Sequence, residues 1–256
     1  MQFFSAHNLC TGIDGLFAHF APQIAALPEH TPLTKDDLLV PHFLLHEAPT
    51  WTLRYAPFDY VNTTARVVIV GIAPGWYQTE MAFRLARNAL REGKSLYDAS
   101  RYARQNASFS GPIRKTLVSM LDGIGLNHAL GIETCMQLYG ARADLLHTTA
   151  AVRYPIFVGN LQNYAGYTPS LFKTPLLRHF IVEVLGGELQ CIPDALVIAV
   201  GKSIGEALQL LVAEGLLEAE RCLIGLPHPS GANAHRPAQF ARVREELAAR
   251  VAEFYR

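Results

Sequence analysis

The amino-acid sequence predicts an α/β protein with three layers, α/β/α, around a central parallel sheet. Two short apolar runs, residues 67–70 and 195–200, end in loops that contain glycine or proline, which is typical of strands buried on both faces. Segments with helical periodicity follow each run, and this alternation favours one parallel sheet with helices on both faces. No repeat or linker divides the sequence, so residues 1–256 are predicted to form a single domain.

The composition is that of a globular protein. Half of the 256 residues are apolar, 17% are charged and the formal net charge is zero, which excludes long disorder and neither requires nor excludes a polyanionic partner. No apolar run is long enough to span a membrane, and no signal peptide is evident. The cysteines, Cys10, Cys135, Cys191 and Cys222, form no Cys-x-x-Cys pair, so we expect reduced thiols in a cytoplasmic protein.

Residues 1–60 are rich in proline and aromatic side chains. We expect a helix near residues 13–24, followed by an extended strap that Trp51, Tyr55, Phe58 and Tyr60 pack onto an α/β core of residues 61–256. His42 and His46 could share a helical face and bind a metal, but no third ligand is evident, so we expect ordinary histidines.

The first predicted strand ends in Gly71-Ile72-Ala73-Pro74-Gly75, a loop that allows the backbone to approach a ligand closely. Residues 76–107 then have a helical and basic pattern. Arg84, Arg87 and Arg91 fall on one helical face, which is either a solvated surface or a patch that binds phosphates.

The middle of the sequence continues the alternation. Phe109-Ser110-Gly111-Pro112 interrupts the helical pattern, which resumes at residues 113–124. A second strand is predicted at 144–152, and the irregular region 153–175 is long enough to indicate a function. The remaining predicted elements are a helix at 176–185 ended by Gly186-Gly187, a strand at 195–200 and a helix at 203–217.

The stretch from Cys222 to Arg236 combines a strand end, a rigid loop and a helix start. Its apolar run stops at Pro227, and Pro237 opens a final helix. His228 lies between two prolines, so a side chain that can titrate near neutral pH is held on a backbone with few alternatives. Such loops at strand ends are where α/β proteins place their chemistry.

Four stretches resemble the uracil-DNA glycosylase superfamily, most closely its thermostable bacterial and archaeal branches. Residues 71–75 are similar to its first motif, and Phe109-Ser110-Gly111 to the segment that stacks an aromatic ring on the flipped base. The strand at 145–152 occupies the place of its second motif. Residues 226–233, Leu-Pro-His-Pro-Ser-Gly-Ala-Asn, resemble its His-Pro-Ser motif. The resemblance covers about residues 60–256 and lacks the cysteines that hold an iron–sulfur cluster in the thermostable branch.

The resemblance implies a monomer that acts on the N-glycosidic bond of a deaminated base in DNA, without a metal or organic cofactor. His228 would stabilise the departing base, Phe109 would stack on it, and Ala73 would contribute backbone around the attacking water. Thr149 would contact the base edge. The further contacts implied with the substrate are Gly71, Ile72, Pro74, Gly75, Tyr77, Ser230 and Asn233, and those with the DNA backbone are Arg84, Arg87 and Arg91.

Two other functions are compatible with the sequence. Superfamily members carry Asp, Asn or Glu in the first motif to position water, where this chain has Ile72 and Ala73. A binding protein for nucleic acid or nucleotides with the same fold is therefore one alternative. The other is a serine hydrolase, because Gly201-Lys202-Ser203-Ile204-Gly205 matches Gly-x-Ser-x-Gly between a strand and a helix, with His228 as the base.

Overall fold

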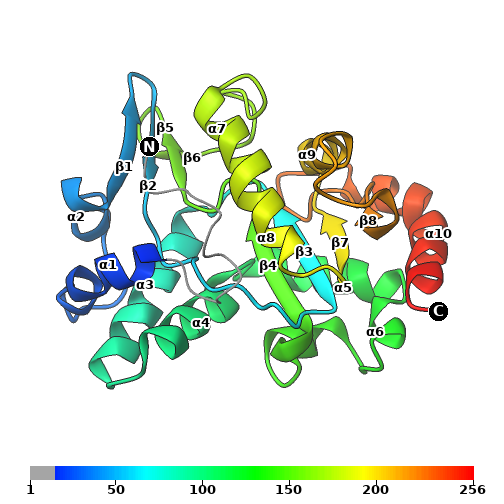
Figure 1. Cartoon of the computed structure of the whole chain (residues 1–256), viewed down its shortest axis with the longest axis horizontal. Helices are drawn as coiled ribbons and strands as arrows, with labels where there is room; N and C mark the ends of the chain where they lie inside the picture. The colour runs from blue at the N-terminus through cyan, green and yellow to red at the C-terminus, as the bar shows by residue number, and fades with distance from the viewer. Residues whose placement is uncertain (1–14) are drawn as a thin grey trace.

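A four-stranded parallel sheet forms the centre of the computed structural model, which describes residues 15–256 (Figure 1). Its strand order is β4-β3-β7-β8, and every neighbouring pair is parallel. The four strands are β3 (Val67–Gly71), β4 (Leu146–Ala150), β7 (Leu196–Ala199) and β8 (Cys222–Leu223). The predicted central parallel sheet is confirmed.

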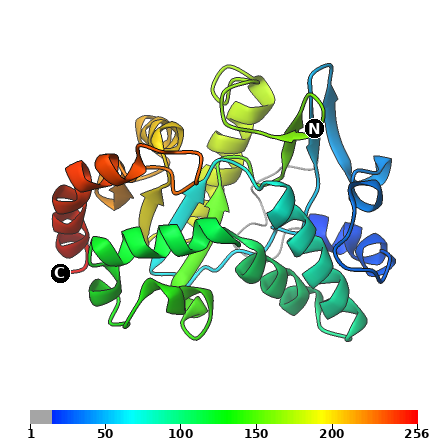
Figure 2. The same ribbon diagram turned by 180° about the vertical axis from the view of Figure 1, so that it is seen from behind.

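Helices cover both faces of this sheet, because β-branched side chains on alternate strand positions build one core on each side. Val68 and Val70 of β3 pack into the core formed with α8 (Gly186–Gln190) and α9 (Lys202–Ala213), which lie in front of the sheet in Figure 1. Val67 and Ile69 pack into the other core. The helices of that core are α5 (Pro112–Gly123), α6 (Leu126–Ala129) and α10 (Arg236–Phe254), seen in front in Figure 2.

A second sheet, antiparallel and also four-stranded, stands beside the first in the order β1-β2-β5-β6. It consists of β1 (Leu44–Ala48), β2 (Trp51–Arg54), β5 (Ile156–Val158) and β6 (Gln162–Asn163). The prediction of one sheet, with a strap before it and an irregular region at 153–175, is therefore wrong. Trp51 pairs with Val158, and contacts between such distant segments leave no local pattern in the sequence.

The N-terminal helices pack against the long basic segment. They are α1 (Gly15–Ala25), α2 (Lys35–Leu38), α3 (Trp76–Arg91) and α4 (Leu96–Ala107), with a short 3₁₀ turn at Pro41–Phe43. The helical segment predicted at 76–107 divides at Ser95, whose Oγ accepts a hydrogen bond from Asp98 N (3.0 Å) and so caps α4. The predicted anchors Trp51, Tyr55, Phe58 and Tyr60 are buried as expected.

One continuous helix spans 175–190, although Gly186-Gly187 were expected to end it. It consists of α7 (Pro175–His179), a π-helical turn (Phe180–Leu185) and α8. A Cβ at Gly186 would lie 3.2 Å from Leu216 Cδ1 and 3.3 Å from Leu211 Cδ2. Glycine is therefore placed inside this helix because the neighbouring α9 region approaches it closely.

The remaining elements are 3₁₀ turns at Cys135–Tyr139, Ala143–Leu145 and Ala219–Arg221. Cys135 and Cys222 are free and buried. Cys191 is disulfide-bonded, so the expectation of reduced thiols is wrong for that residue, and Cys10 lies outside the described residues. No helix within residues 15–256 has the length and apolarity needed to cross a membrane.

Candidate active site

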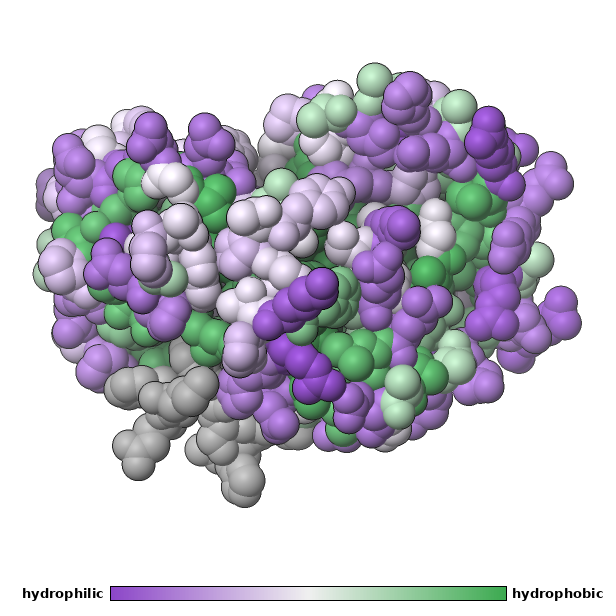
Figure 3. All heavy atoms as spheres, turned by 90° about the horizontal axis from the view of Figure 1, so that it is seen from above, coloured by the Kyte–Doolittle hydropathy of each residue, from purple (hydrophilic) through white to green (hydrophobic). Residues whose placement is uncertain are grey.

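The carboxyl ends of the parallel strands open into a cavity of about 1280 Å³. The loop after β3, the segment between α4 and α5, the end of β4, the start of α9 and the loop after β8 all line it. Figure 3 views the molecule from above, with strongly hydrophilic side chains along the edge near α10 and weakly polar ones toward the middle. Residues 71–75, 109–111 and 226–233 thus reach one cavity through loops. The fourth stretch with a resemblance, at 145–152, reaches it through the end of β4.

Phe109 forms one wall of this cavity and is held in an uncommon backbone conformation. Its φ is 49°, a left-handed value that aromatic residues rarely adopt. Phe109 is only 8% exposed, and a Cβ on Gly71 would lie 3.1 Å from the Cζ atom of its ring. Gly71 therefore makes room for the Phe109 ring at the end of β3.

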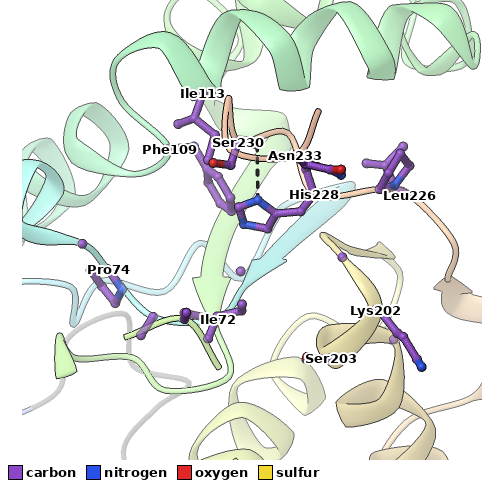
Figure 4. A pocket seen from close by; sticks show the side chains of 18 of the residues that line it. Ile72, Pro74, Phe109, Ile113, Lys202, Ser203, Leu226, His228, Ser230 and Asn233 are labelled. Atoms are coloured by element: carbon purple, nitrogen blue, oxygen red, sulfur yellow. Dashed lines mark hydrogen bonds between the residues drawn. The ribbon is translucent and has the colours of Figure 1, made fainter. Parts of the chain in front are cut away.

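His228 faces the same cavity from the loop after β8 (Figure 4). Ser230 N donates a hydrogen bond to His228 Nδ1 (3.2 Å), and Asn233 Nδ2 donates to the His228 carbonyl (3.3 Å). A Cβ on Gly201, whose φ is 91°, would lie 3.4 Å from His228 Cβ. Hydrogen bonds within the loop and close contact with the start of α9 therefore fix the imidazole.

The protonation state of His228 follows from these contacts. Burial lowers its pKa below the usual value for histidine, so the ring is neutral at pH 7. Because Nδ1 accepts the Ser230 hydrogen bond, the ring proton resides on Nε2. His228 can therefore donate one hydrogen bond from Nε2 to a ligand, and in Figure 4 its ring points toward Phe109.

A buried charged cluster lies behind the wall formed by β4. Glu188 of α8 accepts hydrogen bonds from Arg104 Nη2 (2.8 Å) and Arg153 Nη2 (2.8 Å), and from His147 Nε2. Burial alone would raise the pKa of the Glu188 carboxyl, but the charges of Arg153 and Arg104 hold it well below its usual range. Burial and the charge of Arg104 lower the pKa of His147 to about 4. Glu188 is thus ionised and His147 neutral at pH 7.

Residues 58–248 match the family described as Uracil DNA glycosylase superfamily. The chain belongs to the uracil-DNA glycosylase superfamily. It is also 36% identical over 237 residues to a Bacillus subtilis (strain 168) protein described as uncharacterized protein YoxB, covering 92% of this chain and 91% of that protein. No solved structure matches the chain significantly.

The stretch that resembles the second superfamily motif lies in β4, where Thr149 was predicted to contact the base edge. Thr149 lines the cavity, but its Oγ1 donates a hydrogen bond to Glu188 Oε2 (3.1 Å). Its hydroxyl proton is therefore committed to the buried cluster. From this position Thr149 can offer a ligand only an acceptor.

Asn163 is a cavity residue that sequence reasoning missed, because it reaches the loop after β3, which resembles the first superfamily motif, from β6 of the second sheet. Its Oδ1 accepts a hydrogen bond from Trp76 N (2.8 Å), and a Cβ on Gly75 would lie 3.2 Å from its Nδ2. Ile72, Ala73 and Pro74 also line the cavity. Asn163 thus brings a polar side chain to a loop whose own side chains are apolar.

The three arginines of α3 do not form the predicted patch for the phosphates of a superfamily substrate. Arg84 Nε donates to Glu80 Oε1 (2.8 Å). Arg87 is buried and donates to the carbonyls of Pro28 and His30. Arg91 donates to the carbonyls of Ala25 (2.8 Å) and Leu27 (2.7 Å) at the end of α1. Arg87 and Arg91 instead hold the end of α1 and the segment that follows it, and helical periodicity alone could not reveal these contacts.

Other predicted residues of the superfamily site are distributed around the cavity. Ser230 and Asn233 line it together with His228, whereas Tyr77 is not among its lining residues and is 55% exposed. Its ring lies 3.3 Å from the position of a Cβ on Gly111. Among the residues that the structure describes, no three His, Cys, Asp or Glu side chains are grouped to hold a metal ion.

The geometry does not support the hydrolase alternative. Ser203 lines the cavity, but it already belongs to α9, whereas the left-handed turn before this helix is made by Gly201. A nucleophile elbow instead places the serine itself at the sharp turn. In Figure 4, Ser203 lies away from the His228 ring, and Nδ1 of that ring is occupied by the Ser230 amide.

Proposed function

We propose that this protein is a DNA glycosylase that hydrolyses the N-glycosidic bond of a deaminated base, uracil or a related base, in DNA. One observation carries the proposal: Phe109 and His228 reach a single cavity from separate elements, and the neutral His228 offers Nε2–H to a ligand. Membership of the uracil-DNA glycosylase superfamily supports the same reaction class.

Catalysis would follow from stacking and from stabilisation of negative charge. A base taken out of the duplex would stack on Phe109, a contact worth ~1–3 kcal/mol. When the bond from the base to C1′ of the sugar breaks, the electron pair leaves with the base. His228 Nε2–H would donate to the base oxygen on which charge develops, as donors in an oxyanion hole do. Water then bonds to C1′ and loses its proton, and the base is protonated.

The first-motif loop would position the water through backbone groups and Asn163. The side chains of Ile72 and Ala73 offer no hydrogen bond to water, whereas Asn163 lies against this loop and lines the cavity. Asn163 can hold a water molecule but cannot take its proton, because an amide is a poor base. Rate acceleration would therefore depend mainly on stabilising the departing base.

Contact with DNA would come from the rim of the cavity rather than from α3. Lys202 and Arg242 line the cavity at the start of α9 and on α10. The Lys202 side chain is 92% exposed, so it is accessible to a phosphate. Cationic groups at such positions fix a nucleic acid in place without reading its sequence.

A panel of oligonucleotides that contain uracil, hypoxanthine or xanthine tests the proposal. Release of a base, detected as alkali-labile abasic sites, is expected for at least one substrate. His228→Ala is expected to slow release on the order of a hundredfold or more, the cost of removing one such donor. Salt-sensitive binding without base release would instead show the binding protein that the sequence also allows.

A further inference from the structure

The segment that carries Phe109 is a type II β-turn. Ser110 N donates a hydrogen bond to the carbonyl of Ala107 (3.2 Å), which closes the turn. Ser108, at its second position, has φ −64° and ψ 132°, and Phe109, at its third, has φ 49°. The third position of a type II turn requires a positive φ, so glycine or asparagine usually occupies it. Phenylalanine therefore has a backbone cost here that other contacts must offset.

This cost would be relieved by rotation of a single peptide unit. Type I and type II turns differ in the orientation of the peptide between their second and third residues, which here joins Ser108 to Phe109. In the type I orientation Phe109 would have a negative φ, which carries no strain. Because φ sets the direction of the side chain relative to the preceding backbone, this rotation would move the Phe109 ring from its place against Gly71.

Arg114 of α5 holds this peptide in the type II orientation. Its Nη2 donates hydrogen bonds to the carbonyls of Ser108 (2.8 Å) and Asn106 (2.7 Å). The Asn106 carbonyl belongs to the last turn of α4, where the helix dipole favours a cation. Arg114 is not among the described residues that line the cavity. It therefore acts on the cavity through the turn and not by touching a base.

The guanidinium group of Arg114 is itself held in place by Tyr139. The Arg114 Cζ atom lies 4.3 Å from the centroid of the Tyr139 ring, in the 3₁₀ turn Cys135–Tyr139. Arg114 Nε and Tyr139 Oη are buried and have no hydrogen-bond partner among the described residues. A buried nitrogen without a partner lowers stability, so stability alone does not explain this placement. The two carbonyl bonds of Nη2 explain it.

We propose, resting on the glycosylase function above for the base that stacks on Phe109, that Arg114 is the positioning residue of the site. It fixes the peptide between Ser108 and Phe109 and so keeps the Phe109 ring at the cavity wall, with Tyr139 as its support. Loss of this hydrogen bond lets the turn relax to type I and leaves the wall without its aromatic surface.

Fluorine NMR of the full chain with 4-fluorophenylalanine at position 109 tests this positioning without any substrate. The wild-type protein should give one resonance, and Arg114→Met should shift or split it. Arg221→Met is the matched control. Arg221 is also a buried arginine that donates to backbone carbonyls, those of Ala195 (3.2 Å) and Ile192 (2.5 Å), and its loss should leave the resonance in place. An unchanged resonance in Arg114→Met, or an equal change in Arg221→Met, would overturn the proposal.

Substitutions of Tyr139 give a second test that leaves Arg114 in the chain and decides the matter if Arg114→Met does not fold. Tyr139→Leu removes the aromatic face against the guanidinium group, so the fluorine resonance should again shift or split. Tyr139→Phe keeps that face and removes only a hydroxyl without a described partner, so the resonance should stay that of wild type. The same spectrum for Tyr139→Leu and Tyr139→Phe counts against the role of the stacked pair.

A double-mutant cycle on base release shows whether Arg114 acts through Phe109. The substrate is the oligonucleotide from which the wild-type protein releases a base fastest. Arg114→Met should slow release roughly fivefold to a hundredfold, the contribution of stacking expressed as a rate. In the Phe109→Ala background the same substitution should slow release no further, because the ring that it positions is absent. Equal slowing in both backgrounds would reveal a general effect on the fold and refute the positioning role.

The two kinds of measurement separate this inference from the proposed function. If the wild-type protein releases no base while Arg114→Met changes the resonance of residue 109, the glycosylase function fails and the positioning role stands. If the wild-type protein releases a base while Arg114→Met changes neither the resonance nor the rate, the glycosylase function stands and Arg114 has no positioning role.

Discussion

Substitution of Glu188 by alanine should cause a large loss of stability. Glu188 is fully buried and accepts hydrogen bonds from Arg104 (2.8 Å), Arg153 (2.8 Å) and Thr149 (3.1 Å). Its removal leaves two buried guanidinium groups without their shared carboxylate, and breaking a buried pair in this way costs about 3–5 kcal/mol. For a chain of this length the melting temperature should fall by roughly 6–20 °C.

Urea unfolding followed by tryptophan fluorescence and far-UV circular dichroism measures this loss. Glu218→Ala is the matched control, because Glu218 pairs with the buried Arg221 (3.1 Å) while its own side chain is 68% exposed. Exposed carboxylates in such pairs contribute about 0–1 kcal/mol. A Glu188→Ala protein as stable as the Glu218→Ala protein would show that the cluster does not stabilise the fold as the geometry requires.

Three further predictions concern the site and its support. Because burial lowers the pKa of His228 and its neutral form accepts the Ser230 hydrogen bond, the rate of base release should be constant at neutral pH and fall only at acidic pH, below the usual pKa of histidine. A pH–rate profile that falls with rising pH through neutrality contradicts this. Arg87→Ala should lower the free energy of unfolding by about 1–3 kcal/mol, while the salt dependence of DNA binding, measured by fluorescence anisotropy, stays that of wild type. Gly201→Ala, at a φ of 91° and close to His228, should destabilise the protein by about 1–2 kcal/mol and reduce base release, whereas Gly215→Ala, at a φ of 71° with open space around it, should affect stability alone.

Local patterns in the sequence were sufficient for the central sheet and for the superfamily. The β-branched residues of β3 require burial on both faces, and the structure gives them a core on each side. The prolines around His228 left the backbone few conformations other than the observed loop. The uracil-DNA glycosylase resemblance, based on motif order, is confirmed by the match over residues 58–248.

Contacts between distant segments were not predictable from the sequence. Glu188 appears in the sequence as one helical glutamate, and only folding places it against Arg104 and Arg153. Asn163 lies on β6 of the second sheet, which combines two strands that precede β3 in the sequence with two that follow β4. Only this sheet brings Asn163 to the loop after β3. The basic pattern of α3 led to the prediction of a phosphate patch. Arg87 and Arg91 instead bind backbone carbonyl groups, and the sequence of side chains does not reveal such partners.

The π-helical turn at Phe180–Leu185 has a consequence for the alignment of related sequences. A π-helical turn contains one residue more than an α-helical turn, and each residue advances an α-helix by about 100°. Deletion of a single residue here would rotate the following α8 and turn Glu188 away from Arg104 of α4 and from Arg153, which follows β4. A related protein that is one residue shorter in this segment therefore needs its carboxylate at a neighbouring position. Its helix should be aligned by that carboxylate rather than by residue count.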